Sequence, residues 1–294
     1  MKNRNSEKTG LFLVILAGVC WGVISIFVRG LTALGFTSLQ IMFLRAWLSV
    51  GILFLYFLVK DRSLLKIRLK DLWMFVGSGI LSLTAFSYCY FSSIVRSGAA
   101  VAVVLLYTSP IFVMLMSAVF FREKLTGKKL LCLVQTFLGC VLVAGLIGSR
   151  TRLGLPSLFL GLGAGFGYAL YSVFAGFAVK KYSSLTITFY TMLLSGLALP
   201  LLIDCGQLAD TIASGLEKGW IDMLGIALIC TVIPYIAYTM GLSRMEAGKA
   251  AVLVTVEPMV GTLLGILVYQ EATDPFKLLG ILLIFAAVLL LARD

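Results

Sequence analysis

The chain has 294 residues, of which 61% are hydrophobic and 13% are charged, and its formal net charge is +11. A soluble domain carries about 25% charged residues, so this composition cannot cover the surface of a soluble fold. Nearly all of the six cysteines lie in apolar runs without a CxxC pair, and there is no histidine. This pattern argues against a disulfide framework and a zinc site, and we expect neither a metal nor a cofactor.

Ten apolar runs follow one another along the chain, and each approaches the length of about 20 residues that a spanning helix needs. The runs are 10–29, 37–59, 72–92, 98–121, 128–147, 156–178, 184–203, 219–241, 248–269 and 276–292. They are about twice as long as barrel strands and lack strict alternation. The longest connections, 60–71 and 204–218, are too short for a soluble domain. The sequence therefore predicts an all-α integral membrane protein with ten transmembrane helices.

The basic residues of the connections gather on one side of the predicted bundle. If the N-terminus is cytoplasmic, six of the 24 Lys and Arg residues lie in outer connections, namely Arg29, Arg96, Arg150, Arg152, Lys218 and Lys277. Arg45 lies within a span, and the others face the cytoplasm, most densely between Lys60 and Lys70. Because positively charged short loops stay in the cytoplasm, we expect a multi-pass protein of the cytoplasmic membrane with both termini inside. The charge then reflects topology in a lipid bilayer, and we expect no nucleic-acid partner.

An internal repeat is visible when residues 90–110, YFSSIVRSGAAVAVVLLYTSP, are aligned with residues 238–258, YTMGLSRMEAGKAAVLVTVEP. One offset of 148 places Pro110 on Pro258 without a gap and also places Glu123 on Glu271. Weaker matches extend to the start of each half. We therefore divide the chain into five-helix repeats at 1–148 and 149–294.

A repeat of five spans contains an odd number, so its second copy must enter the membrane from the opposite side. The predicted architecture is thus two inverted five-helix repeats. In transporters, such halves can exchange conformations and open a midplane site to one side and then to the other.

The duplicated motif resembles the EamA-type branch of the drug/metabolite transporter superfamily. Its first copy runs from Ser97-Gly98-Ala99-Ala100 through Pro110 to Phe121-Arg122-Glu123-Lys124-Leu125-Thr126, and its second from Ala247-Gly248-Lys249-Ala250-Ala251 through Glu257-Pro258 to Gln270-Glu271. Trp21-Gly22 and Phe43-Leu44-Arg45-Ala46 are also similar to the family, but the residues after Glu271 depart from its pattern. The resemblance implies a cavity lined mainly by spans 1, 3, 4, 6, 8 and 9, and transport of small organic solutes, often export of amino acids or other metabolites.

Two charged residues lie inside predicted spans, where an ionisable side chain is costly and often marks a transport pathway. Glu257 either accepts a proton or binds a substrate amine, or it caps backbone that Pro258 frees. Arg45 is either a counter-ion for Glu257 or for a substrate carboxylate, or it tethers helices or snorkels towards the surface. The family resemblance favours the structural role for both.

Prolines and aromatic residues supply the remaining candidates. Pro110 and Pro258 are related by the repeat, and each is either a hinge or a packing kink. Trp21 and Ser25 are four residues apart and share a helical face. Tyrosines at midplane need a hydrogen-bond partner that a cavity can supply, whereas those near span ends can anchor at the interface. The tyrosine candidates for the cavity are Tyr88, Tyr107, Tyr168, Tyr171, Tyr235 and Tyr238.

These features together predict a secondary transporter, an exporter or exchanger, that moves a small organic metabolite by alternating access. If Arg45 and Glu257 both face the cavity, an amino acid or a related zwitterion suits them, and protons are a candidate coupling ion. No nucleotide-binding motif is present, so ATP is not the expected driver. The alternatives are a channel and a membrane-embedded enzyme. The absence of histidine, clustered acids and metal-ligand motifs argues against the enzyme.

Overall fold

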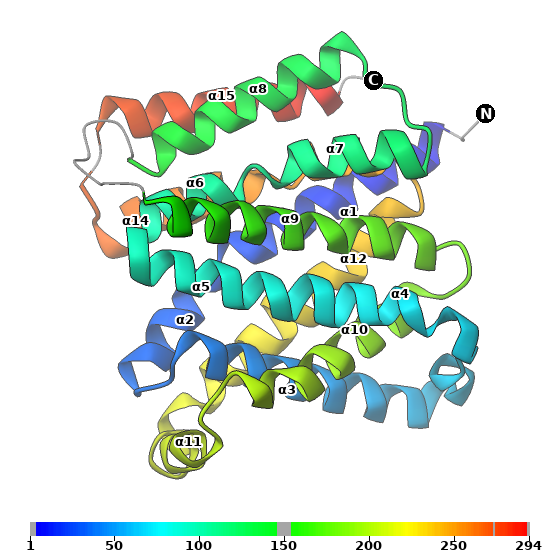
Figure 1. Ribbon diagram of the computed structural model, residues 1–294, viewed down its shortest axis with the longest axis vertical. Coiled ribbons are helices and arrows are strands. Elements are labelled where there is room, and N and C mark those ends of the chain that lie inside the picture. The colour runs from blue at the N-terminus through cyan, green and yellow to red at the C-terminus, as the bar shows by residue number, and fades with distance from the viewer. Residues whose placement is uncertain (1–3, 146–153, 273, 293–294) are drawn as a thin grey trace.

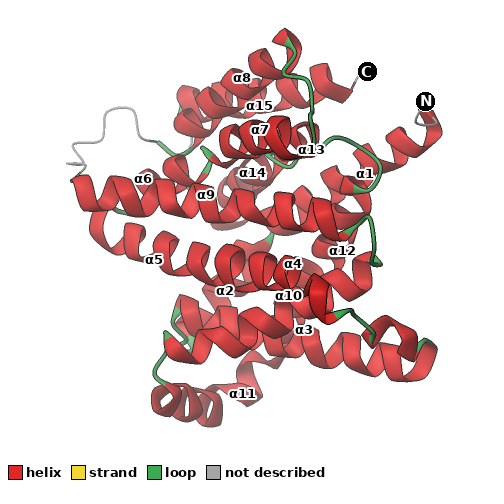
Figure 2. Ribbon diagram, turned by 45° about the vertical axis from the view of Figure 1, so that its right-hand side comes forward, coloured by secondary structure: helices red, strands yellow, loops and turns green. Residues whose placement is uncertain are grey.

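The computed structural model describes residues 4–145, 154–272 and 274–292, which form helices connected by short loops, with no strand in those ranges (Figures 1 and 2). The α-helices are α1 (Arg4–Gly22), α2 (Ile24–Ala33), α3 (Ser38–Lys60), α4 (Leu72–Val76), α5 (Ala85–Ser97), α6 (Ala99–Leu106), α7 (Ser109–Phe120), α8 (Gly127–Val143), α9 (Leu155–Ala178), α10 (Ser184–Ala198), α11 (Cys205–Ala227), α12 (Ile233–Leu242), α13 (Ala247–Leu253), α14 (Val256–Tyr269) and α15 (Pro275–Ala292). Two π-helical segments, Gly77–Thr84 and Leu228–Val232, precede α5 and α12.

Nine segments of the described chain are long and apolar enough to cross a membrane. Helix α8 supplies the tenth span. It has 17 described residues and packs along α15. The contact is close, because a Cβ atom added to Gly280 would meet the carbonyl oxygen of Gly139 at 2.7 Å. The prediction of an all-helical membrane protein with ten spans is confirmed, although the end of the predicted span 128–147 lies outside the described residues.

The packing of the spans is symmetric under exchange of the two halves. Span 1 packs on span 8 through α1 and α12, and span 6 packs on span 3 through α9 and α5, so each pair is the mate of the other. The pairs α3 with α10, α7 with α13, and α8 with α15 join spans 2 and 7, 4 and 9, and 5 and 10, which exchange with themselves. This pairing is what two inverted five-helix repeats require.

Local irregularities of the backbone also recur at the repeat offset. The π-helical segment Leu228–Val232 aligns with the last five residues of Gly77–Thr84. Among the described residues other than glycine, positive φ occurs at Arg122 (55°) and Gln270 (53°), which the offset of 148 also superimposes. Spans 4 and 9 are each broken into two helices, at positions that agree with the offset to within one residue. The repeat therefore preserves distortions as well as helices.

The structure differs from the sequence prediction in two places, one inside a predicted span and one in a predicted connection. The predicted span 10–29 is interrupted at Val23 between α1 and α2. The predicted connection 204–218 is helical, because Asp204 caps α11 by accepting hydrogen bonds from the Gly206 and Gln207 amides at 2.9 and 3.0 Å. Leu208 is buried in a cluster with Leu31, Phe36 and Ile41.

The two ends of the bundle are labelled inner and outer after the topology that the loop charges predict. At the inner end α1 begins and α7, α9 and α12 end. At the outer end α2, α5 and α14 end (Figure 1). Helix α15 ends on the same side as the start of α1, so the two ends of the described chain share the inner end. Arg150 and Arg152 of the charge argument, and the repeat boundary at 148, lie outside the described residues.

Candidate functional site

Four aromatic rings from three spans form a cluster at the centre of the bundle. Trp21 of α1 lies edge-on to Tyr235 of α12 with ring centroids 5.2 Å apart, and Tyr171 of α9 lies edge-on to Tyr235 at 5.0 Å. Tyr238 completes the aromatic box at 5.6 Å from Trp21 and 6.1 Å from Tyr171. Edge-to-face pairs at these separations are favourable beyond their burial. The four residues come from both repeats, so the box joins the two halves.

The box encloses little space. Its cavity is lined by Trp21, Ser82, Leu83, Phe86, Tyr168, Tyr171, Tyr235 and Tyr238 and measures about 20 Å³, room for about one water molecule. A metabolite therefore enters only if the aromatic side chains or their helices move. The hydroxyls of Ser172 and Tyr238 are hydrogen-bonded at 2.8 Å on one side of the box.

The two charged residues of the spans flank the box. The Tyr168 hydroxyl donates to Glu257 Oε2 at 3.2 Å. Arg45 Nη2 donates to the Tyr235 hydroxyl at 3.5 Å, a long hydrogen bond. Each charge is thus hydrogen-bonded to a tyrosine that lines the cavity of the box. The break between α13 and α14 places Glu257 in the first turn of α14.

Two buried donors, one in the box and one beside it, have no hydrogen-bond acceptor among the described residues. They are Arg45 Nε and the Tyr171 hydroxyl. Burying an unpaired polar group costs about 1–3 kcal/mol, and more for a charged group. Such groups are favoured where a ligand supplies the missing acceptor. A carboxylate bound here would satisfy donors that the protein leaves unpaired.

The other predicted residues lie elsewhere. Tyr88 has 49% of its surface exposed on the outside of α5. Ser25, in α2 after the irregular residue Val23, does not line the cavity that Trp21 lines. Tyr107 is buried where α6 ends, and Pro110 and Pro258 lie in the first turns of α7 and α14, directly after the breaks in spans 4 and 9.

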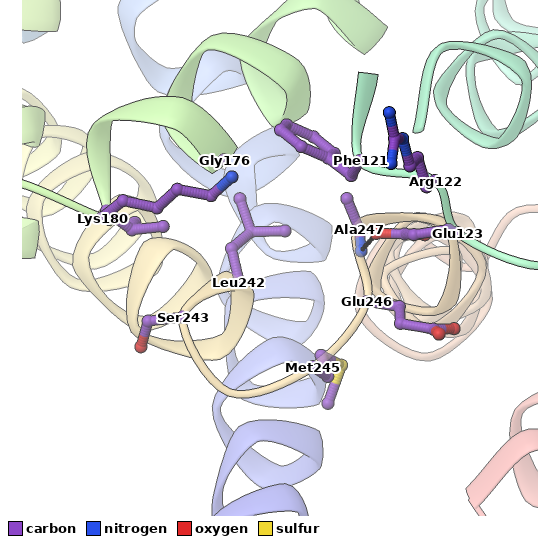
Figure 3. Close-up of a pocket in the computed structure, with 11 residues that line it drawn as sticks. Phe121, Arg122, Glu123, Gly176, Lys180, Leu242, Ser243, Met245, Glu246 and Ala247 are labelled. Carbon is purple, nitrogen blue, oxygen red and sulfur yellow. Dashed lines mark hydrogen bonds between the residues drawn. The ribbon is translucent and has the colours of Figure 1, made fainter. Parts of the chain in front are cut away.

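A larger cavity of about 460 Å³ lies at the inner end, beside the contact between Glu123 and Ala247, and sequence reasoning missed it. Figure 3 shows Lys180, from the connection after α9, reaching towards Phe121 beyond α7. Lys180 Nζ lies 4.9 Å from the centroid of Phe121 and 5.6 Å from that of Phe177. The other lining residues include Gly176, Leu242 and Met245, which lie one helical turn or more beyond the box on the same helices or their extensions. The cavity therefore lies on the inner-end side of the box and is separate from the small cavity that the box encloses.

Further residues that line the box were also missed, namely Ser82, Leu83 and Phe86. In an apolar span, nothing in the sequence distinguishes a cavity-facing Phe or Leu from one that faces lipid. No group of three His, Cys, Asp or Glu side chains that could hold a metal ion occurs in the described part of the chain.

The fold and site define a multi-pass helical membrane protein whose two repeats meet around a polar-rimmed aromatic cluster. The sequence profile of the EamA-like transporter family matches twice, at residues 8–145 and 155–293. The chain belongs to the EamA-like transporter family, and it is a membrane transporter of that family.

Similar proteins support this assignment. A protein of Archaeoglobus fulgidus described as an uncharacterized transporter is 27% identical over 98% of this chain and 97% of its own length. The pseudopaline exporter CntI of Pseudomonas aeruginosa is 24% identical over 97% of this chain and 96% of its own length. A solved crystal structure superimposes with a TM-score of 0.77 over 99% of both chains at 17% identity, which shows the shared fold.

Proposed function

We propose that this protein is a secondary carrier of the cytoplasmic membrane, not an enzyme, that exports or exchanges a small zwitterionic metabolite such as an amino acid. The observation that carries the proposal is the pairing of charges around the aromatic box. Glu257 offers an acceptor for an amine, while Arg45 Nε and the Tyr171 hydroxyl are buried donors without an acceptor among the described residues. A zwitterion supplies both complementary groups.

The aromatic rings supply the rest of the recognition. Trp21, Tyr171, Tyr235 and Tyr238 present ring faces and edges that favour a solute with an apolar or aromatic side chain. A ring can also stabilise an ammonium group, and a cation within about 6 Å of a ring centroid gains about 0.5–2 kcal/mol. The box is almost closed, which suits an occluded step between two open states.

Alternating access follows from the exchange of the two halves. Spans 4 and 9 are both broken into two helices, and Pro110 and Pro258 lie in the first turn after each break. Glu257, which follows the break in span 9, accepts a hydrogen bond from Tyr168 beside the box. We assign these breaks as hinges. Outward transport is favoured because the relative from Pseudomonas aeruginosa is described as an exporter. The larger cavity lies at the end of the bundle that the loop charges predict to be cytoplasmic.

A binding screen is the first test. The full-length protein in detergent is heated with and without each standard amino acid, small amines and small carboxylates, and the unfolding midpoint is recorded. Binding to the native state raises the midpoint in proportion to ln(1 + [L]/Kd). We expect zwitterions with apolar side chains to stabilise more than the matched amine or carboxylate alone. Equal stabilisation by the carboxylate alone would remove the role given to Glu257.

Transport is tested in liposomes with and without a pH gradient. The initial rate is expected to saturate with substrate, as for a carrier, whereas a rate that stays linear supports a channel. If Glu257 carries the coupling proton, Glu257→Gln abolishes the effect of the gradient while the protein stays folded. Glu217→Gln, an exposed carboxylate on α11, is the matched control and keeps the wild-type response. A gradient response retained by Glu257→Gln contradicts proton coupling at this residue.

A further inference from the structure

The carboxylate of Glu123 ties span 4 to span 9 at the inner end. After α7 the chain reverses at Arg122 with a φ of 55°, and the Glu123 amide donates back to the Ser117 carbonyl at 3.2 Å. This turn points the carboxylate at the start of α13. There it accepts hydrogen bonds from the amides of Ala247 at 2.7 Å and Gly248 at 3.0 Å. Both amides are buried in helix-start positions that have no intrahelical acceptor.

The repeat places a second carboxylate, Glu271, in the same local turn at the outer end. Gln270 has a φ of 53°, and the Glu271 amide donates to the Gly265 carbonyl at 3.0 Å. Under the offset of 148, Gly265 is the mate of Ser117 and Gln270 is the mate of Arg122. The backbone that aims Glu123 at its target is thus rebuilt at Glu271.

The two carboxylates nevertheless have different partners. The repeat mates of the Ala247 and Gly248 amides are those of Ala99 and Ala100, which begin α6. Glu271 does not cap them. It accepts from Arg29 Nη2 at 2.5 Å instead. Within the described chain the amides of Ala99 and Ala100 have no hydrogen-bond acceptor, and Ala99 is exposed.

We propose that Glu123 and Glu271 are alternating latches of the transport cycle. The inner latch, Glu123 on the α13 amides, is closed in this structure, and the outer latch, Glu271 on the α6 amides, is open. In the opposite state Glu271 leaves Arg29 and caps Ala99 and Ala100, while Glu123 releases Ala247 and Gly248. The proposal rests on the alternating access proposed above, and it makes both residues positioning residues that do not touch the substrate.

Physical reasons favour a latch over a static cap. Hydrogen bonds to an ionised carboxylate are about twice as strong as neutral ones. A contact made in only one of two conformations shifts their equilibrium by its full differential free energy. Arg29 supplies the opposing bias, because it holds Glu271 away from α6 and is itself fixed over the Tyr269 ring at 3.9 Å from the centroid.

The test measures both ends of the bundle with repeat-matched pairs of spin labels. Lys124→Cys with Ser243→Cys reports the inner end, and Ala272→Cys with Val95→Cys reports the outer end. All four positions are exposed, and the offset of 148 relates one pair to the other. The six native cysteines are replaced, and double electron–electron resonance distances are recorded in lipid nanodiscs without substrate. Only variants that keep the unfolding midpoint of the labelled parent are compared.

The expected signs differ between variants. Glu123→Ala raises the ratio of inner-open to inner-closed molecules about tenfold, and Glu123→Gln, which keeps one acceptor, raises it less. Arg29→Ala frees Glu271 and shifts both distances in the same direction as Glu123→Ala. Glu271→Ala shifts them in the opposite direction. Glu217→Gln, with the same loss of charge at an exposed site, leaves them unchanged.

The latch is overturned if Glu123→Ala and Glu123→Gln give the distance distributions of Glu217→Gln, or if Arg29→Ala and Glu271→Ala shift them in the same direction. Because these distances need no substrate, they are independent of the proposed zwitterion. A chain that changes between two distances but shows no saturable transport contradicts the proposed function and leaves the latch supported.

Discussion

The two halves of this transporter share features of the backbone but not the side chains at the centre of the bundle. The first half rebuilds the π-helical segment, the mid-span break and the positive-φ turn of the second at equivalent positions. The side chains at the centre are different, because Tyr235 aligns with Ser87 and Glu257 with Ser109. A carrier needs interchangeable halves to alternate, whereas a solute needs one particular set of contacts. The comparison suggests that symmetry is confined to the scaffold, and mutations should separate the two roles.

The largest effect is expected at a close backbone contact between spans 5 and 10 of the symmetric scaffold. Gly280→Leu places a side chain on α15 whose Cβ atom lies 2.7 Å from the Gly139 carbonyl oxygen and 2.9 Å from Leu142 Cβ. Overpacking of this kind costs about 3 kcal/mol. We expect the unfolding midpoint in detergent to fall sharply and transport to be lost with it. Gly261→Ala is the control, since its added Cβ atom meets the Gly22 carbonyl oxygen at an ordinary 3.5 Å. An unchanged midpoint for Gly280→Leu would show that spans 5 and 10 are not closely packed.

A change at the asymmetric centre is expected to affect ligand binding without loss of stability. Arg45→Gln removes a buried charge whose Nε has no acceptor among the described residues, so folding keeps or gains stability. The affinity for a zwitterion is expected to fall about 10- to 100-fold, because a charge-assisted hydrogen bond is worth about 1.5–3 kcal/mol. Ligand-dependent shifts of the unfolding midpoint measure both quantities. Arg96→Gln, at an exposed site, keeps wild-type affinity. A loss of stability in Arg45→Gln without loss of affinity would assign Arg45 to the scaffold.

Two tyrosines of the box allow a finer separation. The Tyr238 hydroxyl is paired with Ser172 at 2.8 Å, so Tyr238→Phe is expected to destabilise the protein by about 1 kcal/mol. The Tyr171 hydroxyl has no partner in the described chain, so Tyr171→Phe costs no stability but weakens binding of a carboxylate. The exposed Tyr88 provides the control through Tyr88→Phe, which changes neither quantity. If Tyr171→Phe binds zwitterions as tightly as the wild type, its hydroxyl is not a ligand for the carboxylate.

The sequence was sufficient to predict the scaffold, because the lengths of the apolar runs and the internal repeat determine the number and the relation of the spans. Apolar runs and the offset of 148 predict the ten spans and the relation of Pro110 to Pro258. Whether an individual side chain faces lipid or the protein interior was not predictable in the same way. In a bilayer, both the lipid-facing and the protein-facing sides of a helix are apolar, so Tyr88 and Tyr171 look alike in sequence although one is exposed and the other is buried.

Contacts between distant segments were a second limit. Arg29 and Glu271 are 242 residues apart, and each has a plausible role as a solvated helix end when considered alone. No proline marks the irregular residue Val23 between α1 and α2, so the sequence did not predict it. The repeat did contain an unused signal. Two glutamates at equivalent positions, each followed by a different sequence, indicate one turn with two sets of partners.

The smallest expected effect tests whether the two turns are as alike as their φ values. Arg122 and Gln270 adopt the left-handed conformation that glycine accepts without a steric penalty. Arg122→Gly and Gln270→Gly should therefore each relieve strain, although glycine also makes the unfolded chain more flexible. The two terms nearly cancel, and we expect each variant to change the free energy of unfolding by at most about 1 kcal/mol and by the same amount. Leu125→Gly, at a connection residue without a positive φ, is expected to destabilise because it relieves no strain, makes the unfolded chain more flexible and removes a side chain that is 44% exposed. Chemical denaturation in detergent measures the free energy of unfolding of all three variants. Unequal effects of Arg122→Gly and Gln270→Gly would mean that the inner and outer turns carry different strain. The symmetry of the backbone would then not extend to the turns that carry Glu123 and Glu271.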